Sequence, residues 1–467
     1  MRRDPGGGAN LTALRGHNAA LVLDLLRTAG EEGISRLELA ARTGLTPQAV
    51  SKITARLRAD GLAAEAGRRA STGGKPRTVL RLVPEAAHAI GVHLDRDEVT
   101  VALTDLTGTP LAVRRHAVTL SDGPPQVLET LVRAVRALLA EPAPPPVPRT
   151  APPPRTAPPR PSAPPPAMAP PRPPGPVGSP GAAGPVSASG PVSESSPASE
   201  PSPVGAPDSA GASGPASAPD SAGASGPVGV PGPVGAPVGL RLLGVGVAMP
   251  GPLEHRGGVA GRVTGAAVWD GFPVREALEA RLGVPVVLDK DTNAAALDLA
   301  VRPGAPRSFA YVHLGTGLGA GLVVGGLPLR GERTGAGELG HQTVQLDGPR
   351  CDCGARGCLE ALCLAAVARG ELPEAARILG AGAANLVRLL DIDRVLLGGR
   401  VVLAAPEVFA DGVAAVLADR RLPTPVEVTA TPHAVARGAA QLVLAPVFGL
   451  APSAHPPVYS SEERTIR

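Results

Sequence analysis

The sequence predicts an α/β protein with a bilobal body that follows a small winged helix-turn-helix domain. Three observations lead to this prediction. Residues 1–83 combine short amphipathic helices with a basic hairpin. In residues 84–140 and 241–450, strands that end in polar or Gly-rich turns alternate with helices. Between these two parts, residues 141–240 hold 32 of the 56 prolines and interrupt the body.

The composition excludes several classes of protein. The insertion 141–240 has no Phe, Trp, Tyr, Ile or Cys, so it cannot bury a core and is expected to be disordered, like the tail 451–467. No apolar run approaches the roughly 20 residues that span a bilayer, and no apolar segment typical of a signal peptide follows the first residues. We therefore expect a cytoplasmic protein that does not contact a membrane.

Charge is spread unevenly along the chain. The net charge is +4, yet residues 1–83 hold 14 Lys or Arg against 7 Asp or Glu. The remaining residues are therefore slightly acidic. A basic N-terminal domain favours a polyanionic partner, although a solvated basic face would give the same count.

The N-terminal domain is expected to begin with two helices. Leu and Ala recur at helical spacing over His17–Ala29. Ser35 and Glu38 then form a capping box for a short helix, and Gly44 ends it in the left-handed conformation. These two helices precede a third helix, which is the one expected to contact DNA.

A third helix is expected over Pro47–Asp60, with Thr46 as its N-cap and Pro47 at its first position. Its apolar residues Val50, Ile53 and Leu57 face inward. The opposite face carries the polar residues Gln48, Ser51, Lys52 and Arg56. In a helix-turn-helix this face and the start of the helix enter the major groove, so we expect these residues and Thr46 to contact double-stranded DNA.

A basic hairpin follows this helix. Two alternating stretches, residues 62–66 and 78–82, flank a Gly-rich turn. Its tip carries four basic residues that could contact phosphates as a wing: Arg68, Arg69, Lys75 and Arg77. A three-helix module without DNA-binding function could share the apolar spacing, but the basic wing favours DNA binding.

The body shows strands whose carboxyl ends carry polar residues. Buried strands are expected near residues 89–101, 242–249, 286–290 and 310–314. The third of these presents Asp289, Asp291 and Asn293 and then becomes a helix. Since sites in such sheets lie at the carboxyl edge, we expect the functional site there.

A metal site is expected in the second half of the body. His341 precedes Cys351, Cys353 and Cys358, which gives one imidazole and three thiolates for a closed tetrahedral zinc site. Three cysteines within eight residues are typical of metal ligation in a reducing compartment. A disulfide with a free thiol, or buried unreactive cysteines, are the alternative interpretations. Cys363 is expected to pack in a helix.

The body resembles the ROK family of repressors and sugar kinases, which has the actin-like ATPase fold. The resemblance rests on the stretches GVAMPGPL, DKDTNAAAL, HLGTGLGAGL, GAGELGH, CDCGARGCLE and LLGGR, which occur in the family order. It covers nearly all of the chain outside the insertion. The N-terminal domain is similar to that of the family's transcriptional repressors.

The resemblance implies a sugar site and its residues. It assigns sugar contacts to Glu338, His341 and Glu360, and Asp291 matches the general base of the kinases. In a protein that only binds sugar, Asp291 would accept a hydrogen bond from a sugar hydroxyl. Asn293 lies beside it and could equally be a helix cap.

Departures from the kinase pattern predict that the protein is not an enzyme. The family's first phosphate turn, Asp-x-Gly-Gly-Thr, is replaced by a stretch with His93 at the Asp and Asp95 at a Gly. The Asn that precedes the catalytic Asp is Lys290, and the Asn expected upstream of Trp269 is missing. The second turn, residues 315–319, is retained. Without the first turn, phosphoryl transfer lacks the groups that position its metal.

The leading hypothesis is a sugar-responsive repressor whose body binds a sugar or sugar derivative and forms a homodimer, or a dimer of dimers, on operator DNA. An ATP-dependent sugar kinase with a DNA-binding appendage is one alternative. A DNA-binding protein that no longer senses a ligand is the other.

Overall fold

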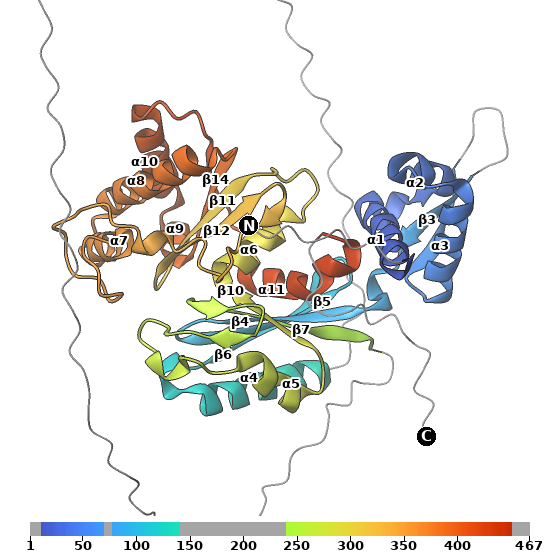
Figure 1. Cartoon of the computed structure of the whole chain (residues 1–467), viewed down its shortest axis with the longest axis horizontal. Coiled ribbons are helices and arrows are strands. Elements are labelled where there is room, and N and C mark those ends of the chain that lie inside the picture. Colours follow the sequence, from blue (N-terminus) through green and yellow to red (C-terminus); the bar gives the residue numbers. More distant parts are fainter. Residues whose placement is uncertain (1–10, 70–76, 141–239, 451–467) are drawn as a thin grey trace, which may run out of the picture. The chain divides into compact units, whose positions relative to one another are not determined.

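The computed structural model describes residues 11–69, 77–140 and 240–450 (Figure 1). The predicted insertion, except for its last residue, and the predicted tail lie outside these residues. None of the helices in the described ranges is long and apolar enough to cross a membrane.

The N-terminal domain has the predicted helices and hairpin. Its elements are α1 (Leu11–Ala29), η1 (Gly30–Glu32), β1 (Ile34–Ser35), α2 (Arg36–Thr43), α3 (Pro47–Ala59), β2 (Ala63–Arg69) and β3 (Arg77–Leu82). The strands form a sheet in the order β1-β3-β2. Helix α1 begins earlier than the apolar spacing indicated, since the predicted start was His17.

The predicted helix caps of this domain are confirmed. The Ser35 hydroxyl accepts from the Glu38 N–H at 3.3 Å, and the Glu38 carboxylate accepts from the Ser35 N–H at 2.9 Å. Gly44 ends α2 with φ 70°, and the Thr46 hydroxyl accepts from the Ala49 N–H at 3.2 Å. These short-range hydrogen bonds fix the turn between α2 and α3.

The body contains two five-stranded sheets with the same topology (Figure 1). The first has the order β10-β7-β4-β5-β6 and the second the order β13-β12-β11-β14-β15. In each, three consecutive strands pair antiparallel. A later strand then pairs parallel with the first of them, and a further strand pairs parallel with that later strand. The strands of the first sheet are β4 (His88–Leu94), β5 (Glu98–Asp105), β6 (Pro110–Ala117), β7 (Leu242–Met249) and β10 (Val286–Lys290). Those of the second are β11 (Phe309–Leu314), β12 (Leu318–Val324), β13 (Leu327–Pro328), β14 (Arg394–Gly398) and β15 (Val426–Val428).

Helices surround and separate these sheets. Helices α6 and α11 lie between the sheets, where apolar residues of both helices and both sheets form one buried cluster. Helices α4 and α5 cover the first sheet from its other side, and α7, α8 and α10 pack with the second. The helices are α4 (Pro124–Ala140), α5 (Val274–Leu282), α6 (Asp291–Ala300), α7 (Leu359–Ala368), α8 (Leu372–Leu390), α9 (Arg400–Ala404), α10 (Pro406–Asp419) and α11 (Ala434–Leu444). Short elements are η2 (Pro84–Ala86), η3 (Leu120–Asp122), β8 (Leu253–Glu254), β9 (Val259–Ala260), η4 (Ala267–Trp269), η5 (Leu339–His341) and η6 (Ala445–Phe448).

Candidate functional site

One candidate surface lies on α3. Val50 and Leu57 are buried and fix the inward face of this helix, as predicted, and Thr54 joins them. The residues predicted to contact DNA are all exposed: Thr46, Gln48, Ser51, Lys52 and Arg56. Because they share the exposed side and the start of one helix, they could contact neighbouring base pairs in a groove.

The hairpin supplies fewer described contacts than predicted. Arg77 is exposed at the start of β3. Arg68 and Arg69 belong to β2, but their side chains, and all of Lys75, lie outside the described part of the structure. The wing prediction therefore rests on Arg77 and on the hairpin itself.

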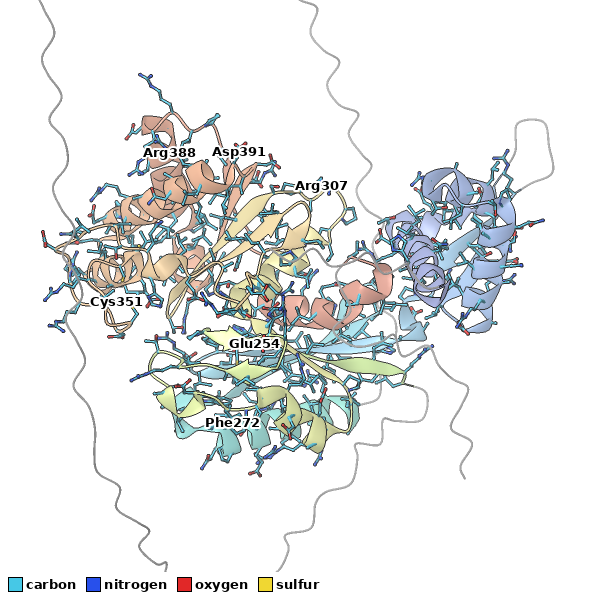
Figure 2. The ribbon with its side chains drawn as sticks, in the orientation of Figure 1. Glu254, Phe272, Arg307, Cys351, Arg388 and Asp391 are labelled. Atoms are coloured by element: carbon cyan, nitrogen blue, oxygen red, sulfur yellow. The ribbon has the colours of Figure 1, made fainter. Side chains whose placement is uncertain are left out.

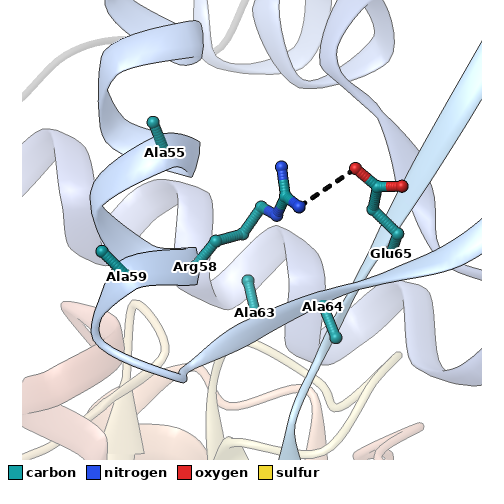
Figure 3. Close-up of a pocket in the computed structure, with 6 residues that line it drawn as sticks. All are labelled: Ala55, Arg58, Ala59, Ala63, Ala64 and Glu65. Carbon is teal, nitrogen blue, oxygen red and sulfur yellow. Dashed lines mark ion pairs between the residues drawn. The ribbon is translucent and has the colours of Figure 1, made fainter.

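A shallow hollow of about 560 Å³ separates α3 from the hairpin (Figure 3). Four alanines line it, and Arg58 and Glu65 form an ion pair of 3.2 Å across it. Both side chains are well exposed, so the pair contributes less than about 1 kcal/mol. The exposed residues predicted to contact DNA lie elsewhere on the helix.

The predicted metal ligands come together in the body. The ligand atoms of His341, Cys351, Cys353 and Cys358 all lie within 4.8 Å of one another. Cys351 Sγ is 3.7 Å from His341 Nδ1, and the sulfurs of Cys353 and Cys358 are 3.6 Å apart. Two sulfurs on a tetrahedral zinc ion with Zn–S bonds of about 2.3 Å would be about 3.8 Å apart. The spacing therefore fits a metal, and the structure holds these cysteines as free thiols.

Without a cation nearby, the buried Cys358 favours its neutral thiol form. Burial raises the pKa of Cys358 to about 12. A bound cation supplies the positive charge that stabilises the thiolate in such a place. Cys351 lies on the loop before α7 (Figure 2). By contrast, Cys363 is buried within α7 and contacts the Ala375 carbonyl, which confirms the predicted packing role.

The metal cluster is joined to two predicted sugar-contact residues. Glu338 directly precedes η5, which ends at His341, and Glu360 follows Cys358 in the first turn of α7. The Glu360 carboxylate accepts from the Leu318 N–H at 2.7 Å, in the Gly-rich turn where β12 begins. A metal that fixes His341 and Cys358 would therefore also fix both carboxylates.

Asp291 begins α6 at the carboxyl end of β10. Within the described residues its carboxylate accepts one hydrogen bond, from the Thr292 N–H at 2.6 Å. Burial raises its pKa to about 7, against this hydrogen bond, and the Asp95 and Glu338 carboxylates raise it further. A carboxylate of this kind can accept a hydroxyl proton near neutral pH.

Asn293, the other predicted residue near this strand end, is held by a carboxylate of the strand. It is fully buried, and its amide nitrogen donates to the Asp289 carboxylate at 2.8 Å. Lys290, not Asn293, occupies the N-cap position of α6. Asn293 thus supports the segment that carries Asp291.

Sequence reasoning missed two ion pairs next to Asp291 in the sequence, each with one buried partner. Lys290 Nζ lies 2.7 Å from Glu338 Oε1 and 2.6 Å from the Ala336 carbonyl, and its side chain is 3% exposed. Arg330 pairs with Asp289 at 2.6 Å. The sequence identified Lys290 as a departure from the family pattern. It did not indicate that Glu338 is its partner, because the two residues are 48 positions apart.

The replaced phosphate turn faces the retained one. Thr316 donates to the Asp95 carboxylate at 3.4 Å, and Arg400 pairs with Asp97 at 3.0 Å. Arg400 also lies 4.0 Å from Asp95. Arg400 follows the Gly398-Gly399 pair at the start of α9, and sequence reasoning did not identify it. Two carboxylates and a guanidinium thus lie together where the family resemblance places the first phosphate turn.

Two histidines near these carboxylates have lowered pKa values. Burial lowers the pKa of His93, and it lowers the pKa of His313 to about 4. His313 is 3.1 Å from the Tyr311 hydroxyl through its Nδ1 atom. Burial thus favours the uncharged form of both imidazoles.

Comparison with known proteins identifies relatives of two kinds. The ROK family profile matches residues 238–370. Kanosamine kinase of Amycolatopsis mediterranei (strain S699) is 32% identical over 222 residues, which cover 41% of this chain and 73% of the kinase. The xylose repressor of Bacillus subtilis (strain 168) is 31% identical over 121 residues, which cover 26% of this chain and 31% of the repressor.

A solved structure is similar over almost the whole chain. It is the crystal structure of a ROK family transcriptional regulator, a homolog of the E. coli MLC protein. The TM-score is 0.62 at 18% sequence identity, and the match covers 94% of this chain and 98% of the regulator. The similarity confirms the predicted fold, an actin-like body together with the N-terminal region.

Proposed function

This chain belongs to the ROK family, and from this premise we propose that it is a sugar-responsive transcriptional regulator, and specifically a repressor. Its N-terminal domain would bind an operator in double-stranded DNA, and its body would bind a sugar or sugar derivative. Such a regulator works in the cytoplasm. The observation that carries the proposal is the exposed polar face of α3, framed by the confirmed caps at Ser35 and Thr46 and followed by a basic hairpin.

The sugar site proposed for the body contains Asp291, Glu338, His341 and Glu360. Asp291 and Glu360 each accept only a backbone hydrogen bond among the described residues, so both keep acceptor capacity for sugar hydroxyls. One carboxylate oxygen of Glu338 pairs with the Lys290 ammonium group, and the Glu338 side chain is 38% exposed. Zinc bound by His341 and the three cysteines would have a structural role, since all four positions of a tetrahedral ion are then filled by protein.

We do not propose a catalytic function. Asp95 and Asp97 favour a cation at the place where a kinase would need to bind phosphate. Asp95 and Asp97 would repel a nucleotide, and the nearby Arg400 already pairs with both. A homodimer is proposed because paired winged helices can then contact two half-sites.

The test is DNA binding by the full chain to the region upstream of its own gene, titrated with salt and with a panel of sugars. Tight, salt-sensitive binding that one sugar weakens would support the proposal. Specific binding that no sugar alters would support a regulator without ligand sensing. No specific binding would contradict the proposal.

One observation favours a kinase as the second candidate. Asp291 has the position and raised pKa of a general base, and the Gly-rich turn after β11 is retained. Kanosamine kinase is also the relative with the longest match described above. Sugar-dependent hydrolysis or transfer of the ATP γ-phosphate would decide for this candidate.

A further inference from the structure

Helix α6 runs from the proposed sugar site to the N-terminal domain. It begins at Asp291 and ends at Ala300, with Val301 as its C-cap, and residues 292–299 are all buried. At 1.5 Å per residue it spans about 15 Å. A displacement at Asp291 is therefore passed to Val301 if the helix moves as a unit.

Close backbone packing makes α6 move as a unit. A Cβ atom on Gly321 of β12 would collide with the Thr292 carbonyl, and one on Gly438 of α11 would collide with the Ala294 carbonyl. Asp298 of α6 also pairs with Arg437 of α11 at 3.2 Å. With backbone contacts on both sides, α6 cannot bend locally, so its shift carries α11 with it.

Arg27 of α1 contacts the C-terminal end of α6. Its Nη1 atom donates to the Val301 carbonyl at 3.1 Å, across 274 positions of sequence. The carbonyl lies at the negative end of the α6 helix, which favours a cation there. Asp24 holds the guanidinium at 2.7 Å, and the side chain is only 12% exposed. Arg27 is thus fixed rather than flexible.

The end of α11 reaches the same side chain. Helix α11 continues into η6, and the Phe448 ring lies under the Arg27 guanidinium, 5.4 Å from its carbon to the ring centroid. Leu23 and Leu26 of α1 belong to one buried cluster with Leu444 and Phe448. The C-terminal end of α6 and the segment that follows α11 therefore both contact Arg27 of the N-terminal domain.

We propose that Arg27 is the positioning residue that couples the Asp291 site to the N-terminal domain, with α6 and α11 as the connecting elements. The inference rests on the proposed function, because it states how sugar binding reaches the DNA-binding helices. A ligand that shifts Asp291 would move Val301 and Phe448 against Arg27, and so change how α1 is held.

The test is hydrogen–deuterium exchange of the full chain, read in the peptides of α1, for a double-mutant cycle. Asp291→Ala perturbs the site end of α6, and Arg27→Met removes the contact at the other end while keeping the apolar stem. We expect Asp291→Ala to speed exchange in α1 by about threefold or more when Arg27 is present, and to have no further effect in the Arg27→Met background. Asp291→Asn repeats the measurement with a milder change.

Arg58→Met is the matched control, since Arg58 pairs with Glu65 inside the N-terminal domain. In that background the effect of Asp291→Ala on α1 should persist. An equal effect with and without Arg27, or no effect on α1 in either, would overturn the inference. The measurement uses no DNA, so failure of operator binding tests the proposed function separately.

Discussion

Arg400 Nη1 lies 3.0 Å from Asp97 Oδ2, although the two residues are 303 positions apart. The pair joins the turn after β4 to the start of α9, and the Asp97 side chain is 60% exposed. An exposed pair of this kind contributes little stability. In the proposed function its importance is chemical, because protein carboxylates and their cation would then lie where a kinase needs phosphate.

The first prediction concerns nucleotide binding. The double variant Asp95→Gly, Asp97→Asn removes two carboxylates and frees Arg400, so ATP affinity should rise about fivefold or more in calorimetric titration. Glu129→Gln is the control, because it removes one exposed carboxylate on α4, in the first lobe. Tight ATP binding by the unchanged protein would contradict the assignment of these residues.

The second prediction concerns zinc. The purified chain should hold about one zinc per molecule by elemental analysis, and Cys358→Ser should lose it and lower the melting temperature by about 5 °C or more. The matched control is Cys363→Ser, since Cys363 packs inside α7 and should keep the metal. A fully folded protein that never binds metal would show that the cluster has another role.

The sequence predicted features that depend on short spacing. The Ser35–Glu38 box, the Thr46 cap and the His341–Cys358 cluster involve residues within one turn or one loop, so spacing alone identifies them. The strands near Asp291 were also recognised, because polar residues follow a buried run. The fold class followed from these elements and from the family resemblance.

Long-range side-chain pairs could not be predicted in the same way. Lys290 and Arg400 acquire their roles from Glu338 and Asp97, which only the assembled sheet edge brings near. Asn293 shows the same limit within one helix. The sequence left it as a ligand or a cap, and the structure shows that it does not cap α6 and that it donates to Asp289. Which side of α6 it faces is set by tertiary packing.

The third prediction concerns Lys290. Lys290→Asn should release the Glu338 carboxylate for sugar hydroxyls and raise the affinity for D-glucose or D-xylose about tenfold in calorimetry. Lys290→Met tests the ion pair alone, since it also frees Glu338 but offers no amide. If both variants bind these sugars as the unchanged protein does, Glu338 does not contact the ligand.

The fourth prediction concerns DNA. Lys52→Ala and Arg77→Ala should weaken binding to specific and random DNA alike, and each should reduce the slope of log affinity against log salt by about 0.9. Gln48→Ala should instead change the preference among operator variants. Arg133→Ala, an exposed charge on α4, is the control and should leave both quantities unchanged.

The fifth prediction concerns pH and Asp291. Burial raises the pKa of this carboxyl to about 7 in the folded protein, whereas an unfolded chain has the ordinary value of about 3.9. The folded state therefore binds an extra proton between these values, so this group's contribution to stability is fully present below about pH 4 and is lost as pH rises to about 7.

The variant Asp291→Asn removes this titration. Its free energy of unfolding should therefore rise relative to that of the unchanged protein as pH increases across this range, by about 1.4 kcal/mol or more at pH 8. Urea unfolding at pH 5 and pH 8 measures the difference, and effects of His93 and His313 cancel because both proteins share them. A constant difference between the two proteins at both pH values would show that Asp291 titrates normally, and would remove the support that its pKa gives to a general base.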